Sequence, residues 1–152
     1  MGKYLDSHHT VSRYIKKKLI MRDENGNVAG IYPQAFELRA DEESLSLSWL
    51  EFFKKTHSEN IEDSVNEFRA MPYEVHGKSG FGIANVGNLC QVCAQSNHPK
   101  VKVLYDGDRK KSNVNSHSSL RNTSNDNELL QNLATKAFST VVIAETVALP
   151  KK

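Results

Sequence analysis

The stretch from Ala35 to Phe53 (AFELRADEESLSLSWLEFF) constrains the fold more than any other part of the chain. Within it, Leu45, Leu47 and Trp49 alternate with serines, which is the period-two pattern of a strand with one buried and one solvated face. A shorter alternation of apolar and charged residues covers 36–39. These patterns predict a folded domain that contains a sheet.

A hairpin is expected near the start of the chain. Residues 25–27 read Asn-Gly-Asn between apolar flanks, which is the composition of a tight turn that needs positive φ. The pattern predicts that residues 11–21 and 31–38 form paired strands. Residues 101–105 (VKVLY) predict a further short strand, and glycine-rich residues 77–88 predict a loop that leads into a strand.

Two helices are expected. Asn60 with acidic residues after it is typical of a helix start, and Pro72 ends that helix near Met71. Apolar residues spaced for one buried face predict a C-terminal helix over 128–149, capped by Asn125 or Asp126. Between them lies a polar segment, residues 106–127, and loops of this length are usually functional or disordered.

The length of 152 residues predicts one domain over residues 1–152. The expected class is α+β, with a small, mostly antiparallel sheet and the C-terminal helix packed on it. A net charge of +2 is too small to indicate a nucleic-acid or membrane partner by itself. Because the chain has no long apolar run and no signal-peptide pattern, we expect a cytoplasmic protein without a membrane partner.

Two short motifs contain histidine. Residues 8–11 read His-His-Thr-Val, and residues 117–120 read His-Ser-Ser-Leu. They resemble the paired motif of the two-histidine phosphoesterases. The resemblance implies that His8 and His117 act as general acid and base on a phosphodiester, while the neighbouring hydroxyls hold phosphate oxygens.

A looser hypothesis keeps His9, Arg13, Tyr14 and His117 as catalytic residues without that fold. Cleavage of an RNA backbone needs a base, an acid and a cation that stabilises the phosphorane, and these side chains could supply them. The alternative interpretation is that the histidines lie on the surface and have no catalytic role.

Cys90, Cys93 and His98 are the candidate metal ligands. Two thiolates at this spacing can hold zinc, but the second ligand pair of a zinc motif is missing. The pattern therefore favours two small buried residues, and we predict neither a metal nor a cofactor. Gly-Lys-Ser at 77–79 is not a Walker motif either, because position 72, where the first glycine belongs, is proline.

The order of several features resembles a family of small uncharacterised bacterial proteins. The features are His9 and Arg13-Tyr14, Phe36–Arg39 leading to Leu45–Glu51, Ala84–Gly87, and His117 before a final helix. The family is linked to mobile-element and anti-phage defence genes. The resemblance implies a bacterial accessory protein with a protein partner encoded nearby.

Two functions follow from these patterns, and they leave open whether the chain is an enzyme. The first is a non-enzymatic accessory or partner-binding protein of a bacterial defence or mobile-element module. The alternative is a small metal-independent phosphodiesterase or ribonuclease that uses a histidine pair, for which a nucleic acid is the partner.

Overall fold

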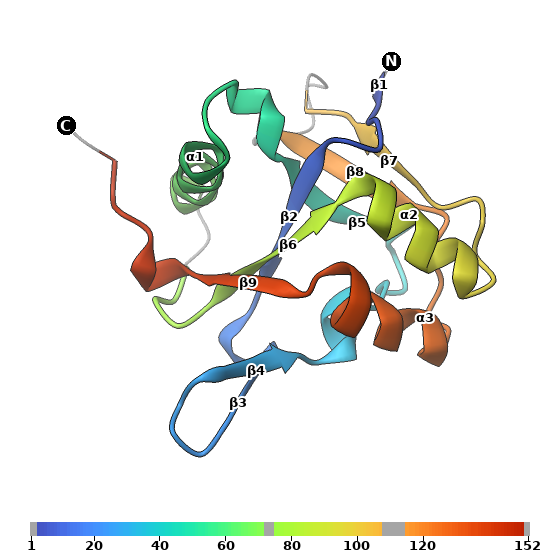
Figure 1. Cartoon of the computed structure of the whole chain (residues 1–152), viewed down its shortest axis with the longest axis horizontal. Coiled ribbons are helices and arrows are strands. Elements are labelled where there is room, and N and C mark those ends of the chain that lie inside the picture. The colour runs from blue at the N-terminus through green and yellow to red at the C-terminus, as the bar shows by residue number, and fades with distance from the viewer. Residues whose placement is uncertain (1–2, 72–74, 108–114, 151–152) are drawn as a thin grey trace.

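A seven-stranded antiparallel sheet organises the chain in the computed structural model, which describes residues 3–71, 75–107 and 115–150. The strand order is β1-β7-β8-β5-β2-β6-β9 (Figure 1). The strands are β1 (Lys3–Tyr4), β2 (Thr10–Ile15), β5 (Ser44–Trp49), β6 (Gly80–Asn85), β7 (Lys102–Tyr105), β8 (His117–Arg121) and β9 (Thr140–Ile143). The α+β class and the antiparallel sheet are as the sequence predicts.

Helices pack on both faces of this sheet. One face places Val11, Ile15 and Leu45 in the main core, against α2 (Val86–Gln95) and α3 (Asn127–Asn132). The opposite face packs Tyr14 and Phe81 against α1 (His57–Arg69). Successive side chains of a strand point to opposite faces, and this alternation separates the two cores.

The predicted hairpin exists, but its strands are shorter than expected. β3 (Ile20–Arg22) pairs with β4 (Val28–Ile31), and Gly26 in the turn has a φ of 81°. Residues 33–36 form a 3-10 helix instead of a strand. Pro33 has no N–H to donate to a neighbouring strand. Phe36 is fully buried against Phe138, so this 3-10 helix packs into the core.

The C-terminal helix is present, but it is about half as long as predicted. Asp126 caps it as expected, accepting from the N–H of Leu129 at 3.0 Å. The α-helix continues as a π-helix over Leu133–Ala137, and the chain then enters β9, which pairs with β6. The run Thr-Val-Val-Ile in β9 is β-branched throughout, and such side chains favour strands.

The polar segment 106–127 was expected to be a loop, and this prediction is wrong for β8, which lies inside it. Ser118 and Leu120 of β8 are fully buried, and the strand pairs with both β5 and β7. Residues 108–114 of the same segment lie outside the described residues. A strand rich in serine lacks the apolar alternation by which strands are recognised.

The start of α1 differs from the prediction, and α2 is a helix that the sequence analysis does not predict. Thr56, not Asn60, caps α1, because its hydroxyl accepts from the N–H of Glu59 at 3.2 Å. The glycine-rich segment leads into β6 as expected, and Asn85 then caps α2, which holds the cysteines. None of the helices in the described ranges has both the length and the apolar character that a membrane crossing requires.

Candidate functional site

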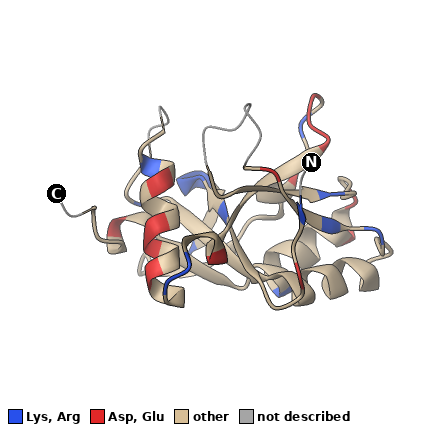
Figure 2. Ribbon diagram, turned by 90° about the horizontal axis from the view of Figure 1, so that it is seen from above, with Lys and Arg blue, Asp and Glu red and all other residues tan. Residues whose placement is uncertain are grey.

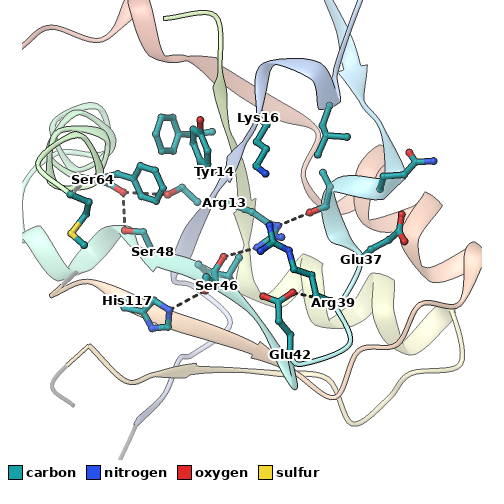
Figure 3. Close-up of a pocket in the computed structure, with 18 of the residues that line it drawn as sticks. Arg13, Tyr14, Lys16, Glu37, Arg39, Glu42, Ser46, Ser48, Ser64 and His117 are labelled. Carbon is teal, nitrogen blue, oxygen red and sulfur yellow. Dashed lines mark hydrogen bonds between the residues drawn. The ribbon is translucent and has the colours of Figure 1, made fainter. Parts of the chain in front are cut away.

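The sheet is incomplete between β2 and β5. These strands pair only at Val11 with Trp49 and Ser12 with Ser48, and beyond these pairs they diverge. A cleft of about 760 Å³ opens there, lined by residues of β2, β5 and α1 and by the segment after β4 (Figure 3). We call this opening the fork cleft.

Arg13 of β2 bridges the two strands inside the fork cleft. Its Nε donates to the carbonyl oxygen of Ala35, and its Nη1 donates to that of Ser46, both at 2.9 Å. Burial lowers the pKa of the Arg13 guanidinium to about 10, so the group remains charged near neutral pH. A guanidinium has five N–H donors, so these two bonds leave donors that can meet a ligand.

The backbone of Ser46 also faces the fork cleft. The N–H of Trp49 donates to the carbonyl of Ser116, so the odd-numbered residues of β5 bond to β8. In an antiparallel ladder the next residue points its N–H and C=O the other way. Ser46 therefore directs both groups toward β2, where Arg13 donates to its carbonyl oxygen.

His117 of β8 lies in the fork cleft between a carboxylate and a hydroxyl. Its Nδ1 is 2.5 Å from Oδ1 of Asp106, and its Nε2 is 3.2 Å from Oγ of Ser46. Figure 3 shows the contact between His117 and Ser46. A carboxylate only accepts, so Nδ1 carries the hydrogen and Nε2 of the neutral ring accepts from the serine. The arrangement is a hydroxyl, an imidazole and a carboxylate in line, as in acid-base catalysis.

Asp106 is held in place from several sides. It is 8% exposed, its Oδ2 accepts from the hydroxyl of Ser119 at 2.6 Å, and its own N–H donates to the carbonyl of His117. Because both carboxylate oxygens are occupied, the imidazole of His117 has a fixed orientation. This order within a strand pair is the preorganisation that a catalytic histidine needs.

A chain of serine hydroxyls runs under α1 beside this site. Glu67 accepts from Ser116 at 2.5 Å, Ser116 and Ser48 are 2.6 Å apart, and Ser64 donates to Ser48 at 2.8 Å. The chain ends at Ser12, 3.3 Å from Ser64. These hydroxyls satisfy one another in a buried position, where an unpaired polar group would be costly.

The charges around the fork cleft are mixed. Lys16 points toward Arg13 from the end of β2, and Arg39 and Glu42 lie across from it (Figure 3). The lining has four basic side chains (Arg13, Lys16, Lys18 and Arg39) and three acidic ones (Glu37, Glu42 and Asp106). Acidic residues also follow the length of α1, where the ribbon is red in Figure 2. Glu42 and Arg39 both act on the charge of Arg13, so an acid and cations share that end of the cleft, with one basic side chain in excess over the whole lining.

Three of the four residues predicted as catalytic line this cleft, namely Arg13, Tyr14 and His117. His9 does not. Its ring packs against Trp49 at 5.3 Å between centroids, whereas His117 lies opposite Ser48 and so shares the other face of the sheet. Burial, with a contribution from His8, lowers the pKa of His9 below 6.5. The structure thus does not bring the two histidines to one substrate.

The predicted metal candidates occupy α2 and the turn after it. Cys93 is buried and Cys90 half-buried, and burial raises the pKa of both thiols, that of Cys93 to about 12. Both ring nitrogens of His98 have partners, the carbonyl of Ser96 and the hydroxyl of Ser124. High pKa values and an occupied imidazole do not suit thiolate and histidine ligation.

Sequence reasoning missed Asp106 and Ser46. The sequence places Asp106 at the start of the polar segment expected to be a loop, and Ser46 on the solvated face of a predicted strand. The repeat of serine at 44, 46 and 48 does signal a strand face with hydroxyls, but nothing in the sequence shows which strand lies beside it. Comparisons with protein-family models, with curated proteins and with solved structures found no match to this chain.

Proposed function

We propose that the chain is a phosphodiesterase that cleaves RNA in the fork cleft, with His117 as the residue that transfers the proton. The observation that carries the proposal is the line of Asp106, His117 and Ser46, together with the guanidinium of Arg13, which donates to the backbone carbonyl of Ser46. This is the alternative that the sequence suggests, with one histidine in place of a pair.

The proposed step uses the 2′-hydroxyl of the substrate as nucleophile. Nε2 of His117 accepts the proton of that hydroxyl, and the oxygen attacks phosphorus to form a 2′,3′-cyclic phosphate. The bond from phosphorus to the 5′-oxygen breaks, and this oxygen takes a proton from a solvent water in the open cleft. Asp106 keeps the proton of the neutral ring on Nδ1, so that the lone pair faces the cleft. Ser46 holds the ring until the substrate replaces its hydroxyl.

Cations support the same step. The charge on phosphorus grows as the new bond forms, and a fixed donor at that position stabilises the transition state. Arg13 is fixed by its bonds to Ala35 and Ser46, and Lys16 points toward it. We propose that Arg13 contacts the phosphate and that Lys16 contributes charge beside it.

The decisive test is cleavage of a short oligoribonucleotide by the full chain in the presence of EDTA. We expect His117→Ala to lower the rate at least about 100-fold, the usual contribution of general acid-base catalysis. His57→Ala, which changes an exposed histidine at the start of α1, should leave the rate unchanged. The deoxyribose analogue should resist cleavage. Cleavage that survives His117→Ala would contradict the proposal.

Asp106→Asn separates positioning from fold. The amide has the same shape but can donate to Nδ1, which moves the ring proton to Nε2 and removes the lone pair from the cleft. We expect a folded protein with a strongly reduced rate. An unchanged rate would show that the imidazole orientation has no part in the reaction.

The accessory role remains a second proposal, and one observation favours it. The β3–β4 hairpin extends away from the sheet (Figure 1), and Val28 and Tyr32 on and beside it are 37% and 43% exposed. Exposed apolar side chains on a hairpin that extends from the sheet are available to contact a partner. Two results together would favour this proposal over the first. Cleavage would not depend on His117, and the native chain would recover a partner that a Tyr32→Ser variant does not.

A further inference from the structure

The turn between β1 and β2 gathers three side chains that could hold a metal ion. Asp6, His8 and His9 each offer one ligand atom, and these atoms lie within 4.8 Å of one another. The group is separate from the fork cleft, since His9 lies on the other face of the sheet from His117. It involves none of the cysteines that the sequence suggested.

The backbone of this turn is fixed by the start of α2. The carbonyl of Ser7 accepts from the N–H of Gly87 at 3.0 Å and from the amide of Asn85 at 2.8 Å, and the carbonyl of His9 accepts from Val86 at 2.9 Å. A side chain at Gly87 would lie 2.9 Å from Ser7, so the two segments are in close contact. Ligands on a turn held this way need little ordering when they bind.

The side chains need only small movements to enclose an ion. With metal-to-ligand distances of about 2.0–2.2 Å, two ligands on one ion lie no more than about 4.4 Å apart. Asp6 and His8 are exposed, while His9 is buried. Rotation of the two exposed side chains can shift their ligand atoms by the few tenths of an ångström required. Nδ1 of His9 accepts from the N–H of Asp6 at 3.1 Å, so this nitrogen faces the turn, and an ion bound to it would replace that hydrogen bond.

We propose that Asp6, His8 and His9 form a site for a divalent transition-metal ion such as Zn²⁺, Co²⁺ or Ni²⁺. Two imidazoles and one carboxylate are borderline ligands that suit these ions, whereas Mg²⁺ and Ca²⁺ prefer all-oxygen sites. Three protein ligands leave coordination positions open to water.

Trp49 gives this proposal a direct readout. It is the only tryptophan of the chain, and its ring centroid lies 5.3 Å from that of His9. A paramagnetic ion held by His9 would quench its fluorescence. We expect Co²⁺ or Ni²⁺ added to the full, untagged chain to give one saturable quench with a stoichiometry of one ion per chain. Diamagnetic Zn²⁺ should reverse it by competition.

Variants assign the quench to these residues. His8→Ala and Asp6→Asn change exposed side chains, and we expect each to weaken Co²⁺ binding by about tenfold or more. His57→Ala removes an exposed histidine elsewhere and should leave the affinity unchanged. Circular dichroism of each variant checks the fold. A quench that does not saturate, or equal affinities for His8→Ala and His57→Ala, would overturn the proposal.

Discussion

Strand β2 has two flanks that are built in opposite ways. Toward β6 it pairs at six consecutive positions, from Thr10 with Asn85 to Ile15 with Gly80. Toward β5 it pairs at only two positions, and the fork cleft opens beyond them. On the first flank the backbone N–H and C=O groups are hydrogen-bonded within the sheet. On the second flank backbone groups remain for Arg13 to bind and, in our proposal, for a substrate.

Side chains follow the same division. On the closed flank, a Cβ at Gly80 would meet Ile20 and Val141 at 2.9 Å, so the packing there leaves no free space. On the open flank the cleft holds about 760 Å³, and its lining combines hydroxyl and charged groups with apolar side chains such as Leu19, Phe68 and Met71. One strand thus contributes to stability on one side and to a polar site on the other, and the two roles can be changed separately.

The largest effect should come from the closed flank. Phe81→Ala removes a ring of β6 that is 2% exposed, packs on Tyr14 and Phe68 and also reaches the lining of the fork cleft. We expect a loss of about 3–5 kcal/mol in the free energy of unfolding. Chemical denaturation measures this loss. A loss below about 1 kcal/mol would mean that this flank can collapse into the cavity and is not the rigid half of the comparison.

Arg13 should give the next largest effect, since it replaces the missing strand pairing. Arg13→Met keeps the apolar stem but leaves the carbonyls of Ala35 and Ser46 without their donor, at a cost of about 1–3 kcal/mol. Arg13→Lys, which restores a charge and one donor, should recover part of it. The free energies of unfolding of the two variants, compared at one pH, measure this. A stabilising Arg13→Met would show that burial of the charge outweighs its two hydrogen bonds.

Sequence reasoning reached the local features of this architecture. The alternation at 45–49 predicted β5, the Asn-Gly-Asn turn predicted the hairpin, and Asp126 was a correct cap. Each of these depends on a few adjacent residues. The antiparallel sheet and the α+β class follow from several such signals together.

The fork cleft could not be reached in this way. Asp106 and His117 are 11 positions apart, and only the pairing of β7 with β8 brings them together. The gap between β2 and β5 depends on where their pairing stops, which no pattern within either strand records. Sequence reasoning therefore found Arg13 and His117 as residue types but not the residues that orient them.

A pair of serines on β5 sharpens the comparison at smaller scale. Ser48 lies in the paired part and bonds to Ser64 and Ser116, so Ser48→Ala should cost about 1–2 kcal/mol. Ser46 lies two residues along, is exposed in the fork, and Ser46→Ala should cost less than about 0.5 kcal/mol. Thermal unfolding of both variants tests this order, and equal losses would remove the distinction between the paired and open parts of β5.

The smallest expected effect on stability, and the most specific one on function, concerns two adjacent lysines. Lys16 lines the fork cleft, whereas Lys17 does not, and both are exposed. Either change to alanine should alter the free energy of unfolding by less than about 0.5 kcal/mol. An exposed charge near a phosphate contributes about 1 kcal/mol in water, so Lys16→Ala should weaken oligonucleotide binding roughly fivefold at low salt. Added salt should reduce this loss of affinity by screening the charge, and Lys17→Ala should not weaken binding. If both variants bind alike, the charge acts at long range over this surface, and the anion is not held at the fork.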